Sequence, residues 1–460
     1  MKTKLLYAAA ALWLSAFAAG LTLYPGSKLI YLVFSISFLA VLLSGFYKQV
    51  SYGYIYLSVF LWLGFWLKLT AHLILKYAYA EPIGLFDGTP ASWDAVLKIS
   101  SVAGISMIAA RAVYSWGGGR NMTLISGDEC KAPAWYMPVR KWIWGSLLIS
   151  VIGIAVFNAV FGIHQIGLYP RTIFPWPINA LVAWSLNIGV AMAMATLVRW
   201  DISARQSVFA PILMVIGEAF TSTVSILSRG TFVYHSIPVL FSVLKNKVSL
   251  VRFSKYKVVF SLIFFVVSFF TSMYAVSALR RYYYADNIPE KVDISGNFSA
   301  LLEQLTGLIV DRWIGLEGVM AVYAYPEKSA SALMAAITEK RTTFEKPIYE
   351  YVSGSKYQAM DNKKYQFGSI PGAVGFFYYS GRVWVVSLGV FLLGLFVLGV
   401  ENVVFRATRN PFLCSLIGMT AANTVAQFGT APRQMIPHFV MIFIAVIIIR
   451  AVEKIPVDSV

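Results

Sequence analysis

Residues 383–400 read VWVVSLGVFLLGLFVLGV, eighteen residues without one charged side chain. A helix that crosses a bilayer needs about 20 mostly apolar residues. Inside the hydrocarbon layer the backbone must satisfy its own N–H and C=O groups, and a helix does this within a single segment. The stretch therefore predicts a membrane-spanning α-helix.

Similar apolar runs recur along the chain, and we predict an all-α polytopic membrane protein with about twelve transmembrane helices. The runs cover residues 4–23, 28–46, 53–77, 94–114, 141–163, 177–198, 207–228, 230–246, 257–277, 383–402, 411–428 and 434–450. The pair 207–228 and 230–246 is the weakest, because only Arg229 separates the two runs. The first run also fits a signal peptide, but its length and the span that follows favour an uncleaved first helix.

The composition of the whole chain supports the membrane assignment. Its 460 residues are 58% hydrophobic and 13% charged, with a mean hydropathy of +0.68, whereas soluble domains carry roughly 25% charged residues. This excludes a soluble enzyme, a disordered chain and a disulfide scaffold. The net charge of +17 is typical of cytoplasmic loops and contacts with anionic lipid, so we expect membrane lipids and no nucleic acid as partners.

The distribution of positive charge predicts the orientation. Lysines and arginines are dense in alternate loops and sparse in the loops between them, which places the N-terminus and the C-terminus in the cytoplasm. The two cysteines, Cys130 and Cys414, then lie on the reducing side, and we expect no disulfide.

One polar segment, residues 278–382, interrupts the apolar pattern and falls outside by parity. It divides the chain into helices one to nine (1–277), an outer loop (278–382) and helices ten to twelve (383–460). Apolar residues at helical spacing predict short helices over 299–324 and 326–340. A loop of this length is unusual between helices, which indicates a functional loop or lid.

Four arginines fall in the predicted outer loops, where positive charge is otherwise scarce: Arg171, Arg229, Arg312 and Arg433. Guanidinium groups bind phosphate through paired hydrogen bonds and stay charged at any relevant pH. A single interfacial arginine more often snorkels or caps a helix, and Arg312 has acidic neighbours. Four arginines in separate outer loops favour a shared anionic ligand such as a pyrophosphate group.

Two residues are candidates for general acid–base work. Glu317 stands in the apolar stretch GLEGVMAV, where burial raises a carboxyl pKa; the alternative is a salt bridge to Arg312. His438 follows Arg433 by five residues and is the second candidate. Glu218 lies inside a predicted span, which by default indicates function, or it bonds Thr221 or a facing helix.

Several common motifs are absent from the sequence. There is no GxxxxGK[ST], GxGxxG, HExxH, CxxC or Asp-x-Asp pattern. Nucleotide hydrolysis, dinucleotide redox chemistry and zinc protease chemistry therefore lack their usual signatures. We expect no metal and no cofactor.

Three stretches resemble Wzy-type O-antigen and capsule repeat-unit polymerases, as does the layout of twelve spans with a late outer loop. The stretches are Ser228-Arg229-Gly230, residues 312–322 (RWIGLEGVMAV), and Asn410-Pro411-Phe412 followed by residues 426–434 (AQFGTAPRQ). The resemblance implies a metal-independent glycosyltransferase in the bacterial inner membrane. Both substrates would be oligosaccharides on undecaprenyl pyrophosphate, and a chain-length regulator is a further candidate partner.

The resemblance also implies roles for individual residues. Pyrophosphate binding at the periplasmic face carries over to Arg229, Arg312 and Arg433, and less directly to Arg171. Two other functions stay open: an O-antigen ligase with the same kind of donor, and a flippase for lipid-linked oligosaccharides, which charges within spans such as Lys68 and Glu218 would permit. The absence of an internal repeat and the long outer loop weigh against the flippase.

Overall fold

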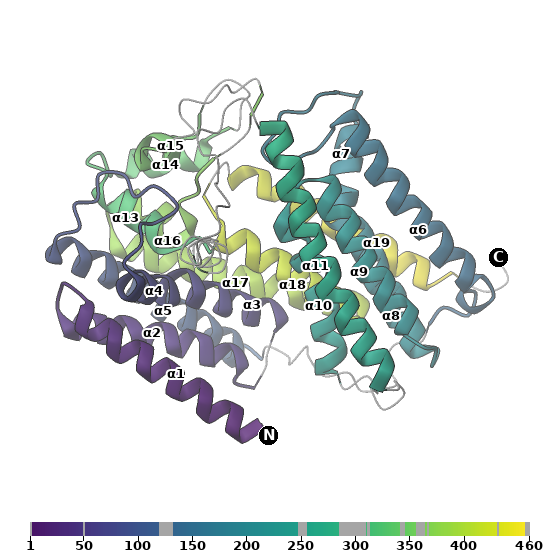
Figure 1. Ribbon diagram of the computed structural model, residues 1–460, viewed down its shortest axis with the longest axis horizontal. Helices are drawn as coiled ribbons and strands as arrows, with labels where there is room; N and C mark the ends of the chain where they lie inside the picture. Colours follow the sequence, from purple (N-terminus) through teal and green to yellow (C-terminus); the bar gives the residue numbers. More distant parts are fainter. Residues whose placement is uncertain are drawn as a thin grey trace.

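The computed structural model describes residues 2–48, 51–118, 132–246, 255–284, 310, 313–340, 346–355, 364–365, 368–429 and 432–455. The regular secondary structure of these residues is helical, and no β-strand forms among them (Figure 1). A lone bridge between Leu168 and Tyr365 joins two loops. The predicted all-α class is confirmed.

The N-terminal helices pack side by side at the lower left of Figure 1. They are α1 (Lys2–Leu23), α2 (Lys28–Phe46), α3 (Tyr52–Trp62), a π-helical turn (Leu63–Leu67), α4 (Lys68–Leu75) and α5 (Pro90–Trp116). The segments from α3 to α4 form one continuous helix. Helix α5 begins where it does because the Thr89 side chain accepts from the Ser92 N–H and Pro90 opens the first turn.

The middle of the chain forms a second group of long helices, at the right of Figure 1. They are α6 (Tyr136–Phe161), α7 (Ile178–Trp184), a second π-helical turn (Ser185–Gly189), α8 (Val190–Ser203), α9 (Phe209–Ser225), α10 (Arg229–Lys245) and α11 (Lys255–Tyr284). Helix α11 continues to Tyr284, seven residues past the predicted end of the ninth apolar run at residue 277. The aliphatic stretch ends there, but the last turns still pack against the end of α9.

The C-terminal helices lie between the two groups. They are α17 (Val383–Thr408), α18 (Pro411–Ala426), a 3₁₀ turn η6 (Pro432–Gln434) and α19 (Met435–Glu453). Asn410 begins α18 by accepting from the N–H groups of Phe412 and Leu413. Helix α18 packs on α3 and α10 and is almost wholly buried, so it forms the centre of the core.

The described part of the predicted outer loop contains four short helices: α13 (Leu316–Ala324), α14 (Ala330–Thr338), α15 (Ile348–Ser353) and α16 (Gly372–Tyr378). Glycines let this segment approach its neighbours closely. A Cβ on Gly64 would lie 2.5 Å from the carbonyl oxygen of Ile314, and one on Gly318 would lie 1.8 Å from that of Pro371. The helix predicted over 326–340 is shorter, and of 299–324 only the part from Leu316 is a described helix; most of residues 299–312 lies outside the described residues.

Eight helices among the described residues are long and apolar enough to cross a membrane. They are Lys28–Phe46, Tyr52–Leu75, Pro90–Trp116, Tyr136–Phe161, Ile178–Ser203, Tyr256–Tyr283, Val383–Thr408 and Pro432–Glu453. Shorter apolar helices cover Tyr7–Leu23, Phe209–Ser225 and Pro411–Ala426. Lengths and composition thus agree with a polytopic membrane protein.

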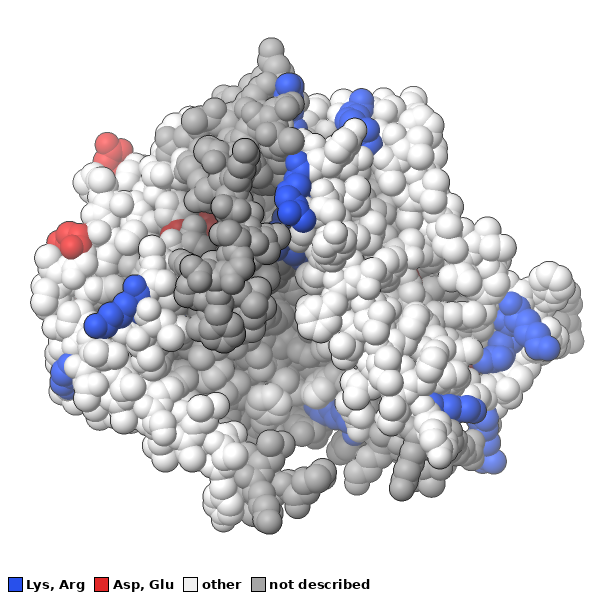
Figure 2. Space-filling model, in the orientation of Figure 1, with Lys and Arg blue, Asp and Glu red and all other residues white. Residues whose placement is uncertain are grey.

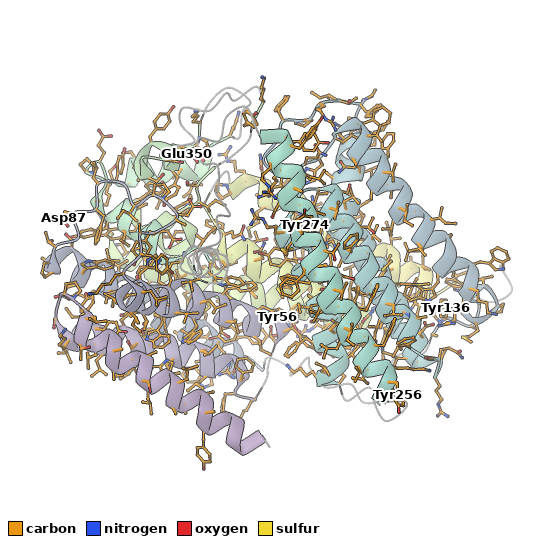
Figure 3. All side chains as sticks on the ribbon, viewed as in Figure 1. Tyr56, Asp87, Tyr136, Tyr256, Tyr274 and Glu350 are labelled. Carbon is orange, nitrogen blue, oxygen red and sulfur yellow. The ribbon has the colours of Figure 1, made fainter. Side chains whose placement is uncertain are left out.

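Successive long helices run in opposite directions, so the bundle has two ends. We call the end at which Leu75, Tyr284 and Val383 lie the loop end, because α13–α16 lie there, at the upper left of Figure 1. Figure 3 labels Glu350 at the loop end and Tyr136 near the opposite end. At that opposite end, Arg140 and Tyr136 of α6 both donate to the buried Asp201 of α8.

Candidate functional site

The predicted arginines form the first group at the loop end. Arg229 is the first residue of α10 and follows a tight corner at Leu227 and Ser228. Leu227 has φ of +56°, a left-handed conformation that a branched side chain rarely adopts. Arg280 of α11 donates to the Leu227 carbonyl oxygen from Nε at 3.0 Å and from Nη2 at 2.7 Å. Arg280 therefore fixes the corner from which Arg229 projects.

Arg171 joins the same end of α11 from the loop between α6 and α7. Its Nη2 donates to the carbonyl oxygen of Ala159 at 2.8 Å, and its guanidinium carbon lies 5.5 Å from the centre of the Tyr283 ring. Tyr283 follows Arg280 by three residues, so both side chains project from the same side of the helix. Figure 2 shows basic side chains beside the upper end of α11.

Arg433 lies on η6 and is exposed. The segment that carries it connects the two halves of the molecule. Near its start, Gln427 Nε2 donates to the Tyr234 hydroxyl of α10 at 3.3 Å, and at its end η6 packs against α14. Arg312 lies outside the described residues, so its position relative to the other arginines stays a prediction.

The structure thus brings Arg171 and Arg229 to the last turns of α11 and adds Arg280. Backbone carbonyl oxygens orient the guanidinium groups of Arg280 and Arg171, and the Tyr283 ring contacts that of Arg171. Such preorganised cations suit a phosphate or pyrophosphate group. Arg280 was not predicted, because the ninth span was expected to end at residue 277. A helix extended to Tyr284 would have placed Arg280 beside Arg229.

Glu317 belongs to a different group. It lies in the first turn of α13 and forms an ion pair with Lys68, the first residue of α4, and both side chains are almost fully buried. Burial raises the pKa of the Glu317 carboxyl, and the Lys68 ammonium opposes that rise. The other carboxylate oxygen, Oε2, is buried and bonds no other described residue. The predicted alternative, a salt bridge from Glu317 to Arg312, lies partly outside the described residues, and the described partner of Glu317 is Lys68.

Further carboxylates surround this ion pair. Ser369 donates from its hydroxyl to Glu81 Oε2 at 3.0 Å and from its backbone N–H to Glu350 Oε1. Burial raises the pKa of Glu350. Tyr349, the residue before Glu350, is 2% exposed, and its hydroxyl bonds no other described residue. These residues join α15 and the segment before α16 to the loop that follows α4.

Glu218 is engaged by a histidine of the facing helix. Its Oε1 lies 2.9 Å from His235 Nδ1 and accepts from Ser222 at 2.8 Å. The other ring nitrogen, His235 Nε2, lies 2.8 Å from the backbone oxygen of Asn187, in the π-helical turn before α8. The Asn187 carbonyl oxygen only accepts, so Nε2 donates to it and Nδ1 faces the Glu218 carboxyl group. The buried pair joins α9, α10 and the π-helical turn, which gives Glu218 a structural role.

His438 lies on the first turn of α19, half-buried, with its ring 5.6 Å from that of Phe439. Cys414 is buried in the core and is not in a disulfide, while Cys130 lies outside the described residues. In the part of the chain that the structure describes, no three His, Cys, Asp or Glu side chains gather as a metal site requires.

The chain matches no protein-family model, no curated protein and no solved structure. Two groups of charged residues are available at the loop end: the arginines at α10 and α11, and the buried pair of Lys68 and Glu317.

Proposed function

We propose that the protein is a membrane-embedded glycosyltransferase that polymerises oligosaccharide repeat units carried on undecaprenyl pyrophosphate, at the periplasmic face of the bacterial inner membrane. The product would be O-antigen or a related surface polysaccharide. The observation that carries the proposal is the set of oriented arginines at one end of the bundle. Arg280 of α11 donates to the corner that precedes Arg229, and Arg171 lies over the Tyr283 ring of α11.

The topology that goes with this function has twelve crossings and both termini in the cytoplasm. Each of the twelve predicted runs coincides with a helix, and the helices alternate in direction along the chain. This alternation supports twelve crossings and not only the eight helices of full membrane length. The short helices α9, α10 and α18 pack against longer neighbours. Basic side chains are also frequent at the end opposite the loop end (Figure 2), as expected of a cytoplasmic face.

The chemistry requires a stabilised leaving group. When the growing glycan moves to the new repeat unit, the bond between its anomeric carbon and the pyrophosphate oxygen breaks, and negative charge develops on that oxygen. Fixed guanidinium groups stabilise such a charge without reorganising during the reaction. We assign this role to Arg229, with Arg171, Arg312 and Arg433 as further ligands of the pyrophosphate.

The acceptor hydroxyl must lose a proton to a base. We propose Glu317 as the first candidate for this base and His438 as the second. The two candidates require the acceptor hydroxyl to lie in different places. Glu317 has a buried carboxylate oxygen, Oε2, that no other described residue engages, so a sugar hydroxyl would have to enter beside Lys68. His438 lies five residues beyond Arg433 on the same segment, nearer to the bound pyrophosphate in this scheme.

The test is an extension assay with purified protein in detergent and one synthetic repeat unit on undecaprenyl pyrophosphate. We expect a ladder of lengthened lipid-linked glycans without added nucleotide or metal. Transfer of glycan only to added lipid A-core would instead identify an O-antigen ligase. Movement of the lipid-linked unit across vesicle membranes without extension would identify a flippase, and either result would overturn the proposal.

A further inference from the structure

A groove of about 550 Å³ runs between α5 and α17. Its floor is formed by small residues, among them Ser106 and Ser387, whose hydroxyl oxygens lie 2.8 Å apart. Its rims are apolar and exposed: Ile105 is 55%, Trp384 60% and Leu388 50% exposed. Both helices are long and apolar enough to cross a membrane, so the groove opens sideways into hydrocarbon.

At the end of the groove away from the loop end, α5 and α17 pack tightly and close it. A Cβ on Gly394 of α17 would lie 2.9 Å from Ala110 and from the sulfur of Met107, both on α5. The two helices therefore meet about one turn beyond the groove. A chain lying in the groove can leave it only toward the bilayer or toward the loop end.

Two cations flank the groove at the loop end. Lys98 is exposed and precedes Val102 of the groove by one turn on the same face of α5. Arg382 is exposed and immediately precedes Val383 and Trp384, the first groove residues of α17. Asp94, the acid one turn before Lys98, accepts instead from the Tyr24 hydroxyl at 2.9 Å and the Ser27 N–H at 2.9 Å.

We propose that this groove binds a polyisoprenyl phosphate lipid, with one isoprenoid chain between Ile105 and Trp384 and the phosphate on Lys98 and Arg382. The apolar rims match the chain and the two cations match the phosphate. One groove closed at the end away from the loop end suits a single-chain lipid better than a phospholipid with two acyl chains. The site is distinct from the arginines at α10 and α11.

The identity of the lipid rests on the proposed function. Joining two lipid-linked glycans requires two lipids to be held at once, and the arginines at α10 and α11 account for only one of them. We assign the groove to the acceptor. Helices α13 and α16 pack on α5 and α17 respectively, so a glycan that leaves the groove at the loop end meets the helices that carry Glu317 and its neighbours.

The experiment is photolabelling of the full chain in phosphatidylcholine nanodiscs. The probe is undecaprenyl phosphate with a diazirine near the end of its chain, and labelled peptides are located by mass spectrometry. We expect labels on α5 and α17. Ala109→Trp fills the groove from an exposed position, and the double variant Lys98→Gln, Arg382→Gln removes the cations; each should lower labelling about tenfold.

Matched controls are Ala11→Trp on the exposed face of α1 and Lys76→Gln after α4, and neither should change the labelling. Equal labelling of Ala109→Trp and the unmodified chain would overturn the inference, as would complete competition by an equimolar amount of phosphatidylglycerol. The extension assay is scored separately. Groove labelling without a glycan ladder would support the lipid site and reject the polymerase function. A glycan ladder without groove labelling would support the polymerase function and reject the lipid site.

Discussion

The two charged groups at the loop end differ in how their charges are held. At α10 and α11, Arg280 and Arg171 donate to backbone carbonyls, and Arg171 lies over an aromatic ring. These contacts hold the guanidinium groups in place. At α4 and α13, Lys68 and Glu317 cancel each other's charge inside the protein.

This difference assigns ligand binding to the arginines at α10 and α11, and the attachment of α13 to α4 to the buried ion pair. Oriented guanidinium groups attract phosphate, whereas removing one partner of a buried ion pair is costly because the other charge is left buried alone. The pair of Lys68 and Glu317 therefore holds the outer-loop helices on the span. The arginines, in contrast, are expected to matter for activity and little for stability.

The largest expected effect comes from breaking the buried pair. Lys68→Ala or Glu317→Ala leaves an unpaired buried charge and should lower the free energy of unfolding by about 3–5 kcal/mol. Thermal unfolding of the purified variants in detergent measures this. The double variant Lys68→Met, Glu317→Leu should recover most of the loss, because apolar residues of similar volume replace a buried pair well.

The same double variant separates anchoring from catalysis by Glu317. If Glu317 is the base, the double variant folds but does not extend glycans. If extension returns together with stability, Glu317 acts only as an anchor and His438 becomes the first candidate. A double variant no more stable than either single variant would contradict the account of Lys68 and Glu317 as a buried ion pair that apolar residues can replace.

The next largest effect is on activity. Arg229→Ala should lower the extension rate about 10²–10³-fold, the usual cost of removing one donor that stabilises developing negative charge. Its unfolding temperature should stay near that of the unmodified chain. Arg406→Ala, at an exposed position in the last turn of α17, is the matched control at the opposite end of the bundle. Full activity of Arg229→Ala would remove the pyrophosphate role.

A smaller effect is expected at Arg280, which acts through Arg229. Arg280→Leu removes both hydrogen bonds to the Leu227 carbonyl oxygen and should lower the extension rate about tenfold. Arg280→Lys, which can keep one of the two bonds, should fall between Arg280→Leu and the unmodified chain. If Arg280→Lys were as impaired as Arg280→Leu, a role in positioning would be rejected in favour of direct contact with substrate.

The smallest effect concerns pH. Because burial raises the pKa of Glu350 above its ordinary value of 4.5, the folded chain holds this proton more tightly than the unfolded chain. The stability contribution is therefore present below pH 4.5 and is lost as pH rises through the raised pKa. Glu350→Gln should flatten this decline in unfolding temperature. An unchanged pH profile in Glu350→Gln would show that another group titrates there.

Much of the fold could be predicted from the sequence, because uninterrupted apolar runs of membrane length have few structural solutions. Helix ends were harder to predict: α11 continues through Arg280 to Tyr284, where polar residues at the helix surface hide the continuation. Long-range pairing could not be predicted. Nothing in the sequence around Lys68 or Glu317 indicates that they pair across 249 residues.

The site was predicted in part. Arg171 and Arg229 could be selected because positive charge is scarce in the predicted outer loops, and they lie at the same end of α11. Arg280 was missed because it was placed in a loop, and the partner of Glu317 because local spacing pointed to Arg312. Contacts formed by π-helical turns and glycine corners, such as Gly64 on Ile314, leave no periodic signal in the sequence.

The claim that glycan is transferred from a pyrophosphate held by Arg229 is tested most directly by measuring the released leaving group, undecaprenyl pyrophosphate. Purified protein is supplied with the synthetic repeat unit on undecaprenyl pyrophosphate, and released undecaprenyl pyrophosphate is measured against new glycosidic bonds over time. Transfer from a pyrophosphate held by Arg229 predicts equal amounts at every time point, with both lost in Arg229→Ala. Bond formation without release of undecaprenyl pyrophosphate, or release without bond formation, would contradict it.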